Sequence, residues 1–383
     1  MTVTAPTGFR ATGIAAGLKA SGGLDLALVV NDGPADAAAG VFTTNRVKAA
    51  PVLWSQRVLS TGRLHAVVLN SGGANACTGR GGFADTHATA EAVAAALGVG
   101  AVDVAVCSTG LIGERLPMDA VLPGVEKAAA ALSTTGGDAA AGAIMTTDTV
   151  PKTAVRRGAG WTVGGMAKGA GMLAPGMATM LCVLTTDAGI SASTLDSVLR
   201  GATRRTFERV DSDGCMSTND TVLALASGAS EVAPAVDAFA TAVRDVCADL
   251  TQQLLTDAEG ATKDVTIDVV DAVTEDDAVE VGRAVARSAL LKCALHGADP
   301  NWGRVLAAVG TTSAAFDPDA LDVSINGIQV CRAGAAGEPR ELVDLSGRTV
   351  RLVVDLHAGP AAATVWTNDL SPGYVRVNSA YSS

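Results

Sequence analysis

The chain has 383 residues, of which 48% are hydrophobic and 17% are charged, and its formal net charge is −11. A chain of this length and composition forms one large domain or two and is not intrinsically disordered. The acidic surplus repels phosphate backbones, which disfavours nucleic-acid binding.

The seven cysteines and four histidines show no disulfide or metal-binding pattern. No CxxC pair occurs and most cysteines lie in apolar context, which predicts buried, reduced thiols and a cytoplasmic protein. Because the histidines have neither HExxH nor HxH spacing, we expect no metal site. We also expect no secretory signal, since the N-terminal segment lacks an apolar stretch, and no membrane span, since glycines and a proline interrupt the uncharged run 169–186.

Strand-like and helix-like stretches alternate in the first half. Strands are predicted where β-rich runs end in turn residues, at 24–30, 64–70 and 102–110. Residues 86–98 predict a helix with a Thr86 cap and a Gly98 stop. The Ala-rich stretch 118–132 predicts another helix, which starts or bends at Pro123.

The middle of the chain carries an unusual turn. The stretch KGAGMLAPGMATML, residues 168–181, is rich in glycine and methionine, and the following LCVLTTDA is typical of a buried strand. A small-residue turn therefore delivers Thr179 to the start of a strand.

Helices and strands are also predicted beyond this turn. Helices are predicted at 194–210, 234–256 and 280–296, and the second of these carries an apolar stripe at helical spacing: Phe239, Val243, Val246, Leu250 and Leu254. Strands are predicted at 265–273, 350–356 and 362–367, and Asn326 and Gly327 predict a hairpin turn. We predict an α/β fold with helices packed on sizeable sheets, in two lobes joined near residues 150–190.

Several predicted strands and helices end in polar, glycine-rich loops, at residues 69–79, 107–117, 146–152, 210–221, 257–263 and 296–304. Together they suggest a binding surface built from many loops. Each loop by itself is better explained as an ordinary turn, because Gly, Asn, Asp and Ser dominate turns.

Thr179 is the candidate nucleophile. The chain has no G-x-S-x-G elbow, no Walker A motif and no dinucleotide-binding glycine pattern after a strand. A threonine hydroxyl needs a base, and one solution is to free the residue's own α-amine by cutting the preceding peptide bond. Such an amine titrates near roughly 7.7–8.0 and accepts a proton near neutral pH. A threonine with no catalytic role remains the alternative at this point.

Seven motifs in order give the chain a resemblance to a known family. They are FTTNRVKAAPV (42–52), CSTGLIGERLP (107–117), TTDTVPK (146–152), KGAGMLAPGMATML (168–181), STNDT (217–221), DPNWGR (299–304) and the C-terminal VNSAYSS. With these motifs the chain resembles the ornithine acetyltransferase family, also called the arginine-biosynthesis bifunctional glutamate N-acetyltransferases, over nearly its whole length. The resemblance implies that family's own α/β fold, with an N-terminal threonine nucleophile made by self-cleavage.

The resemblance also implies how the chain is processed and assembled. The cut falls between Ala178 and Thr179 and produces an α chain, 1–178, and a β chain, 179–383. The two chains stay together, and two such pairs associate into a heterotetramer. No metal or organic cofactor is implied, although some members accept acetyl-CoA as donor.

Site roles carry over onto matching positions. Thr179 matches the nucleophile, and Thr109 and Gly110 match the oxyanion-hole pair. The positions that match substrate contacts are Thr146, Lys168, Thr179, Glu259, Asn378 and Ser383. Lys168 suits a carboxylate and Glu259 an ammonium. The alternative for both is a surface charge beside a turn.

The implied reaction is ping-pong. Thr179 takes the acetyl group of N2-acetyl-L-ornithine, ornithine leaves, and the amine of L-glutamate then attacks the acetyl-threonine to give N-acetylglutamate. The chain departs from the family pattern at Gly73, around 214–216 and at Ser383, which puts fine substrate preference in doubt. The alternatives are an N-terminal-nucleophile amidase or aminopeptidase, a paralogous acetyltransferase of a specialised pathway, and a non-catalytic binding protein.

Overall fold

A computed structural model describes residues 2–174 and 180–380. Its first lobe contains a four-stranded sheet of order β1-β2-β4-β5. The strands are β1 (Phe9–Ile14), β2 (Leu26–Asn31), β4 (Ala66–Asn70) and β5 (Val104–Ser108). Neighbours in this sheet are antiparallel except β4 and β5, which are parallel. Every residue of β2, β4 and β5 is buried, because both faces of the sheet are covered.

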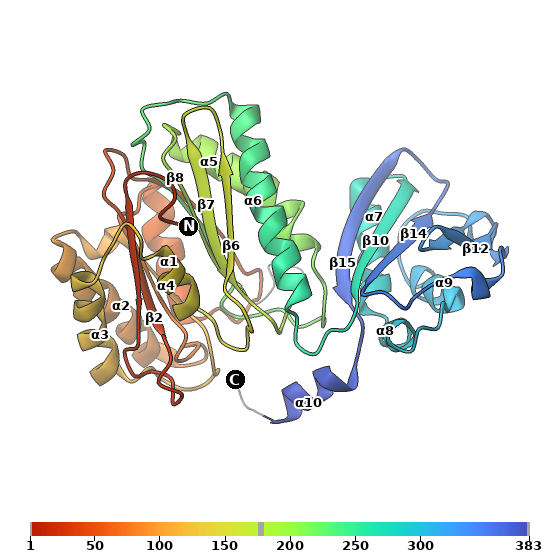
Figure 1. Cartoon of the computed structure of the whole chain (residues 1–383), viewed down its shortest axis with the longest axis horizontal. Helices are drawn as coiled ribbons and strands as arrows, with labels where there is room; N and C mark the ends of the chain where they lie inside the picture. The colour runs from red at the N-terminus through yellow and green to blue at the C-terminus, as the bar shows by residue number, and fades with distance from the viewer. Residues whose placement is uncertain (1, 175–179, 381–383) are drawn as a thin grey trace.

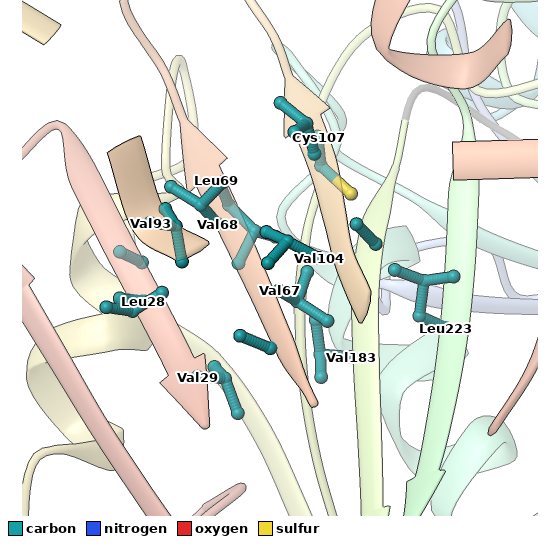
Figure 2. Close-up of a cluster of buried hydrophobic side chains, with 14 of the residues drawn as sticks. Leu28, Val29, Val67, Val68, Leu69, Val93, Val104, Cys107, Val183 and Leu223 are labelled. Atoms are coloured by element: carbon teal, nitrogen blue, oxygen red, sulfur yellow. The ribbon is translucent and has the colours of Figure 1, made fainter. Parts of the chain in front are cut away.

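A five-stranded sheet of order β3-β9-β8-β7-β6 packs against the first. Its strands are β3 (Ala37–Phe42), β6 (Lys152–Arg157), β7 (Thr162–Lys168), β8 (Leu181–Thr186) and β9 (Thr221–Ala226). Val183 and Leu223 from this sheet share a core with Val67 and Val104 of the other (Figure 2). Residues on the opposite face, such as Leu184, join a separate core.

Helices cover the outer faces of both sheets, which gives four layers (Figure 1). The helices beside the four-stranded sheet are α1 (Ala50–Val58), α2 (Gly79–Leu97), α3 (Met118–Ala130) and α4 (Gly137–Ala143). Helices α5 (Ala192–Arg204) and α6 (Val236–Thr256) pack on the five-stranded sheet. All five residues of the predicted stripe on α6 are buried.

The second lobe is built on a six-stranded sheet of order β13-β12-β11-β14-β10-β15. Its strands are β10 (Asp264–Ala272), β11 (Asp322–Ile325), β12 (Ile328–Arg332), β13 (Ala335–Ala336), β14 (Thr349–Asp355) and β15 (Ala361–Asn368). Helices α7 (Glu275–Arg287), α8 (Ala289–His296) and α9 (Trp302–Val309) share its core. The last helix, α10 (Pro372–Ala380), leaves this lobe and turns back toward the first (Figure 1).

Short 3₁₀ turns complete the secondary structure, at Leu59–Thr61, Ala101–Asp103, Phe207–Arg209, Pro318–Ala320 and Arg340–Leu342. Among the helices of the described ranges, none combines the length and the apolarity that a membrane span requires.

The mixed α/β fold and the two lobes are confirmed, but the predicted junction near 150–190 is wrong. Strands β7 and β8 are antiparallel neighbours with Lys168 paired to Leu181, so the chain between them connects strands of one sheet. The lobes instead separate between α6 and β10, at residues 257–263.

Three predicted helices also differ in their boundaries. The helix predicted at 194–210 is α5, which ends at Arg204 and is followed by the 3₁₀ turn Phe207–Arg209. Helix α2 begins at Gly79, and Thr86 lies inside it, bonded through its hydroxyl to the Gly82 carbonyl. A Cβ on Gly82 would lie 1.9 Å from the Thr78 hydroxyl, so this glycine permits close packing that outweighs its low helix propensity. The predicted helix 280–296 is two helices, because Ser288 leaves helical geometry (φ −68°, ψ 98°) and caps α8.

The cysteines follow their prediction only in part. All seven are free thiols, and Cys107, Cys182, Cys247 and Cys331 are buried. Cys77, Cys215 and Cys293 are exposed, because each lies in a loop or on the outer face of a helix and not on a buried strand.

Candidate active site

One cavity is lined by six of the residues predicted for the site: Thr109, Gly110, Thr146, Lys168, Glu259 and Asn378. They come from the end of β5, the loop before β6, the end of β7, the segment between the lobes, and α10. The cavity therefore lies where the two lobes meet. The predicted residues Ala178, Thr179 and Ser383 lie outside the described residues, so their roles stay predictions.

Thr109 and Gly110 form a turn at the end of β5. The backbone N–H of Thr109 donates to the Asn70 carbonyl (3.0 Å), so its hydroxyl is the group available to the cavity. Gly110 has φ +131°, and a Cβ there would lie 2.9 Å from the backbone of Gly73. Only glycine adopts this conformation at this distance without strain.

Lys168 is a buried ammonium at the end of β7, with a side chain only 2% exposed. The alternative that it is a surface charge is therefore wrong. Its Nζ donates to the Thr109 hydroxyl oxygen (3.1 Å). Burial lowers the pKa of Lys168, while the carboxylates of Asp148, Asp220 and Glu259 act in the opposite direction. Since Thr109 accepts from Lys168, its own hydroxyl proton is directed elsewhere.

Glu259 and Asn378 connect the lobes at the cavity. The Glu259 carboxylate accepts a hydrogen bond from the Thr147 hydroxyl (2.7 Å) and another from the Asn378 amide (2.9 Å). A Cβ on Gly171 would lie 2.7 Å from this carboxylate, so the glycine allows Glu259 to approach the loop after β7. Glu259 is thus held in place by both lobes.

A buried charge network, which the sequence analysis missed, positions Thr146 and Lys168. Asp148 accepts hydrogen bonds from the backbone of Thr146 (3.0 Å) and Gly169 (2.7 Å) and from Lys152 Nζ (2.6 Å). Lys152 also pairs with Asp257 (2.6 Å). Burial opposes ionisation of Asp148, but the charges of Lys168 and Lys152 and these hydrogen bonds hold its pKa below the ordinary value. The TTDTVPK motif carries the signal for this network, because it contains Asp148 and Lys152 as well as Thr146.

The STNDT motif supplies another missed group. The Asn219 amide donates to the carbonyls of Ala74 (2.6 Å) and Ser108 (2.7 Å), which fixes the turn that carries Thr109. Asp220 is fully buried, and its Oδ1 accepts from the backbone N–H of Met180 (3.1 Å). Burial raises the pKa of Asp220 well above its usual range. This carboxyl therefore lies beside the residue that follows Thr179.

The comparisons with known proteins point to one family. A model of the ArgJ family matches residues 10–383. The arginine biosynthesis bifunctional protein ArgJ of Streptomyces coelicolor is 68% identical over 383 residues, which is 100% of both chains, and that of Thermobifida fusca is 61% identical with the same coverage. A solved structure of ornithine acetyltransferase complexed with ornithine, from Mycobacterium tuberculosis, is 67% identical, with a TM-score of 0.45, over 47% of this chain and 96% of that one.

The Asp148 network predicts a pH-dependent stability. Asp148→Asn should lower the free energy of unfolding by about 3 to 5 kcal/mol at pH 7, because it leaves two buried lysines without their shared carboxylate. Since the folded pKa of Asp148 lies below its unfolded value, its contribution is complete above that value and is lost as pH falls through the folded pKa. The difference between the variant and the wild type should therefore shrink below about pH 4.

Urea unfolding at several pH values between about 7 and 3 measures this difference. Asp249→Asn is the matched control, because Asp249 pairs with Arg156 at the surface and should cost less than about 1 kcal/mol. If the two variants lost equal amounts of unfolding free energy, Asp148 would not be the centre of the network.

Proposed function

The chain belongs to the ArgJ family, and on this basis we propose that it is an acetyltransferase that moves the acetyl group of N2-acetyl-L-ornithine to L-glutamate. The products are ornithine and N-acetylglutamate, which places the reaction in arginine biosynthesis. The cavity that joins Thr109, Gly110, Lys168 and Glu259 beside the start of β8 is the observation that carries this proposal.

The nucleophile is the hydroxyl of Thr179, freed by self-cleavage after Ala178. The cut produces chains 1–178 and 179–383, which stay together. Two observations support this position. Met180, which is covalently joined to Thr179, is held by Asp220, and the next residue in sequence, Leu181, pairs with Lys168. Leu181 pairs with a residue that lines the cavity, and this supports a nucleophile two positions before β8.

Acetyl transfer proceeds in two half-reactions. The Thr179 hydroxyl attacks the acetyl carbonyl while its α-amine takes the proton, and ornithine leaves with that proton on its nitrogen. The amine of glutamate then attacks the acetyl-threonine ester and restores the hydroxyl. In both steps negative charge develops on the acetyl oxygen, where the Thr109 hydroxyl and the Gly110 N–H stabilise it.

Lys168 prepares the oxyanion hole. Because its ammonium donates to the Thr109 oxygen, the Thr109 proton is directed away from Lys168 and is available to the developing oxyanion. Lys168 also supplies positive charge to the substrate region, and the fixed carboxylate of Glu259 supplies negative charge. Thr146 and Asn378 line the same cavity, which supports their proposed role as substrate contacts, and we propose Ser383 as a further contact.

The reaction as proposed needs no metal or organic cofactor, since the nucleophile and its base belong to one residue. Acetyl-CoA is proposed as an additional donor, with the acetyl group entering by the same acetyl-threonine. We further propose a cytoplasmic heterotetramer of two α and two β chains.

Self-cleavage predicts two fragments. Purified wild-type protein should give two chains by intact mass under denaturing conditions, and the second should begin TMLCVLTTDA on N-terminal sequencing. Thr179→Ala should remain one chain because the hydroxyl is absent, while Thr179→Ser should still cleave. A cut in the alanine variant would mean that an external protease acts.

The destination of the acetyl group tests the reaction class. With N2-acetyl-L-ornithine labelled in the acetyl group, the label should appear on L-glutamate, and initial rates at several glutamate concentrations should give parallel double-reciprocal lines. Label recovered as free acetate regardless of glutamate would indicate an amidase or aminopeptidase. Transfer to a different amine in preference to glutamate would indicate an enzyme of a specialised pathway.

The oxyanion hole predicts a hydroxyl requirement at position 109. Thr109→Val should lower kcat about 10²- to 10³-fold, because one donor to the oxyanion is lost, and Thr109→Ser should retain most of the activity. Thermal unfolding of each variant checks that the fold survives. A valine variant that is folded, cleaved and fully active would remove Thr109 from the mechanism.

A further inference from the structure

A second cavity, of about 240 Å³, adjoins the candidate active site. Glu259 lines both cavities, so this residue lies between them. The second cavity lies between the loop 212–214 of the first lobe and α7, α8 and the end of β15 in the second. Its volume is below the range of drug-sized pockets and suits part of a small metabolite.

Lys292 presents a buried ammonium to this cavity. Its side chain is 6% exposed, and its Nζ donates to the Ser212 carbonyl and to the Thr367 hydroxyl (3.0 Å). An ammonium has three N–H groups, and the described residues accept two of them. Burial lowers the pKa of Lys292 to about 8, so it carries its charge at neutral pH. One donor with a full positive charge is therefore left for a ligand.

Arg287 adds a second cation on the same side. Its Nε donates to Asp211 (2.7 Å), and within the described ranges the two terminal NH₂ groups of the guanidinium have no hydrogen-bond acceptor. These groups are the fork that binds a carboxylate at two points. Arg287 is half exposed, so a ligand can reach it.

Each carboxylate near these cations accepts at least one hydrogen bond from the protein. Asp211 accepts from Arg287, and Asp213 accepts from the backbone of Cys215 (3.0 Å). Asp369 accepts from the backbone of Thr262 and Lys263 (2.8 Å each) and from His296 (2.8 Å). Asp211 Oδ1 is buried without a hydrogen-bond partner among the described residues, but Asp211 does not line the cavity. The unbonded donors of Lys292 and Arg287 therefore make the side of the cavity formed by α7 and α8 suitable for a negative group.

The proposed reaction needs one site for two side chains of opposite charge. Ornithine ends in an ammonium and glutamate in a carboxylate, and in both the charged atoms lie four bonds from the α-carbon. Because one nucleophile accepts the acetyl group and then donates it, the α-amines of ornithine and glutamate occupy the same position in turn. The two side-chain ends therefore reach the same region.

We propose that the second cavity is the side-chain subsite of the proposed reaction, where Lys292 and Arg287 bind the side-chain carboxylate of the acceptor and Glu259 binds the side-chain ammonium of ornithine. This inference rests on the proposed function. It assigns recognition of the acceptor to residues of the second lobe, outside the cavity that holds Thr109 and Lys168.

The test compares acceptors that differ only in charge. The ratio of kcat/KM for L-glutamate to kcat/KM for L-glutamine should fall about 10- to 100-fold in Lys292→Met and in Arg287→Met, because each loses a charge-assisted hydrogen bond to the carboxylate. The ratio is independent of the amount of folded enzyme, since both acceptors are measured on one preparation. Release of ornithine from N2-acetyl-L-ornithine in the first half-reaction should not fall in either variant, because removing a positive charge from the shared region does not weaken binding of the ornithine ammonium.

Lys263→Met is the matched control. Lys263, the last residue of the segment between the lobes, is also buried. It donates to the backbone carbonyls of Leu345 (2.6 Å) and Gly347 (2.7 Å) in the second lobe, but it does not line the cavity. The ratio of kcat/KM for L-glutamate to kcat/KM for L-glutamine should be the same in Lys263→Met as in the wild type. An unchanged ratio in both Lys292→Met and Arg287→Met would overturn the proposal, as would an equal fall in the control.

Calorimetric binding separates this proposal from the proposed function. If wild-type protein acetylates neither amino acid, the proposed reaction fails, and binding of L-glutamate and L-glutamine to wild type and Arg287→Met decides the subsite. A preference for glutamate that is lost in Arg287→Met supports the carboxylate site. Equal binding of both amino acids to both proteins overturns it.

Discussion

The arrangement of the site depends on one buried charge, the ammonium of Lys168. A lysine that is 2% exposed loses its hydration, so the protein must supply polar partners around it. Thr109 accepts its hydrogen bond, and Asp148 lies close enough to stabilise its charge. Since Asp148 also holds the backbone of Thr146 and Gly169, the loops that line the cavity are fixed to the same group.

Sheet stacking explains how these loops reach one place. Strand β7 ends where β8 begins, because Lys168 pairs with Leu181, and β9 begins beside β8, because Leu181 pairs with Thr221. The packed four-stranded sheet brings the end of β5 to the same edge, where Lys168 contacts Thr109. Val183 and Leu223 share a buried core with Val67 (Figure 2), and this core fixes how the two sheets stack on each other. A rigid scaffold of this kind is what preorganised oxyanion donors require.

The second lobe completes the site without supplying the proposed nucleophile or the oxyanion donors. Glu259 lies in the segment between the lobes and is held by Thr147 on one side and Asn378 of α10 on the other. Beyond Glu259, Lys292 and Arg287 offer positive charge across a small cavity. In the proposed reaction this division separates acetyl chemistry, in the first lobe, from recognition of the side chain, in the second.

The local sequence pattern was sufficient to predict those helices and strands in which buried residues recur at regular spacing. The apolar stripe of α6 and the alternation along β10 predicted their buried faces, and Asn326 and Gly327 predicted the hairpin between β11 and β12. Local pattern failed where tertiary packing outweighs propensity. Gly79 begins a helix because its neighbour Gly82 packs against Thr78, and Ser288 divides one periodic stretch into two helices.

The sequence by itself determined the family, the secondary structure of the periodic segments and the positions of Thr109, Gly110, Lys168 and Glu259, because ordered motifs and periodicity are local properties. Only the tertiary structure decided that the lobes divide at 257–263 and that Asp148, Lys152 and Asp257 form one network. It also decided that Lys292 faces a cavity beside Glu259. These partners lie as many as 105 residues apart in the chain, as Lys152 and Asp257 do, and such pairings come from burial and charge compensation that no local stretch contains.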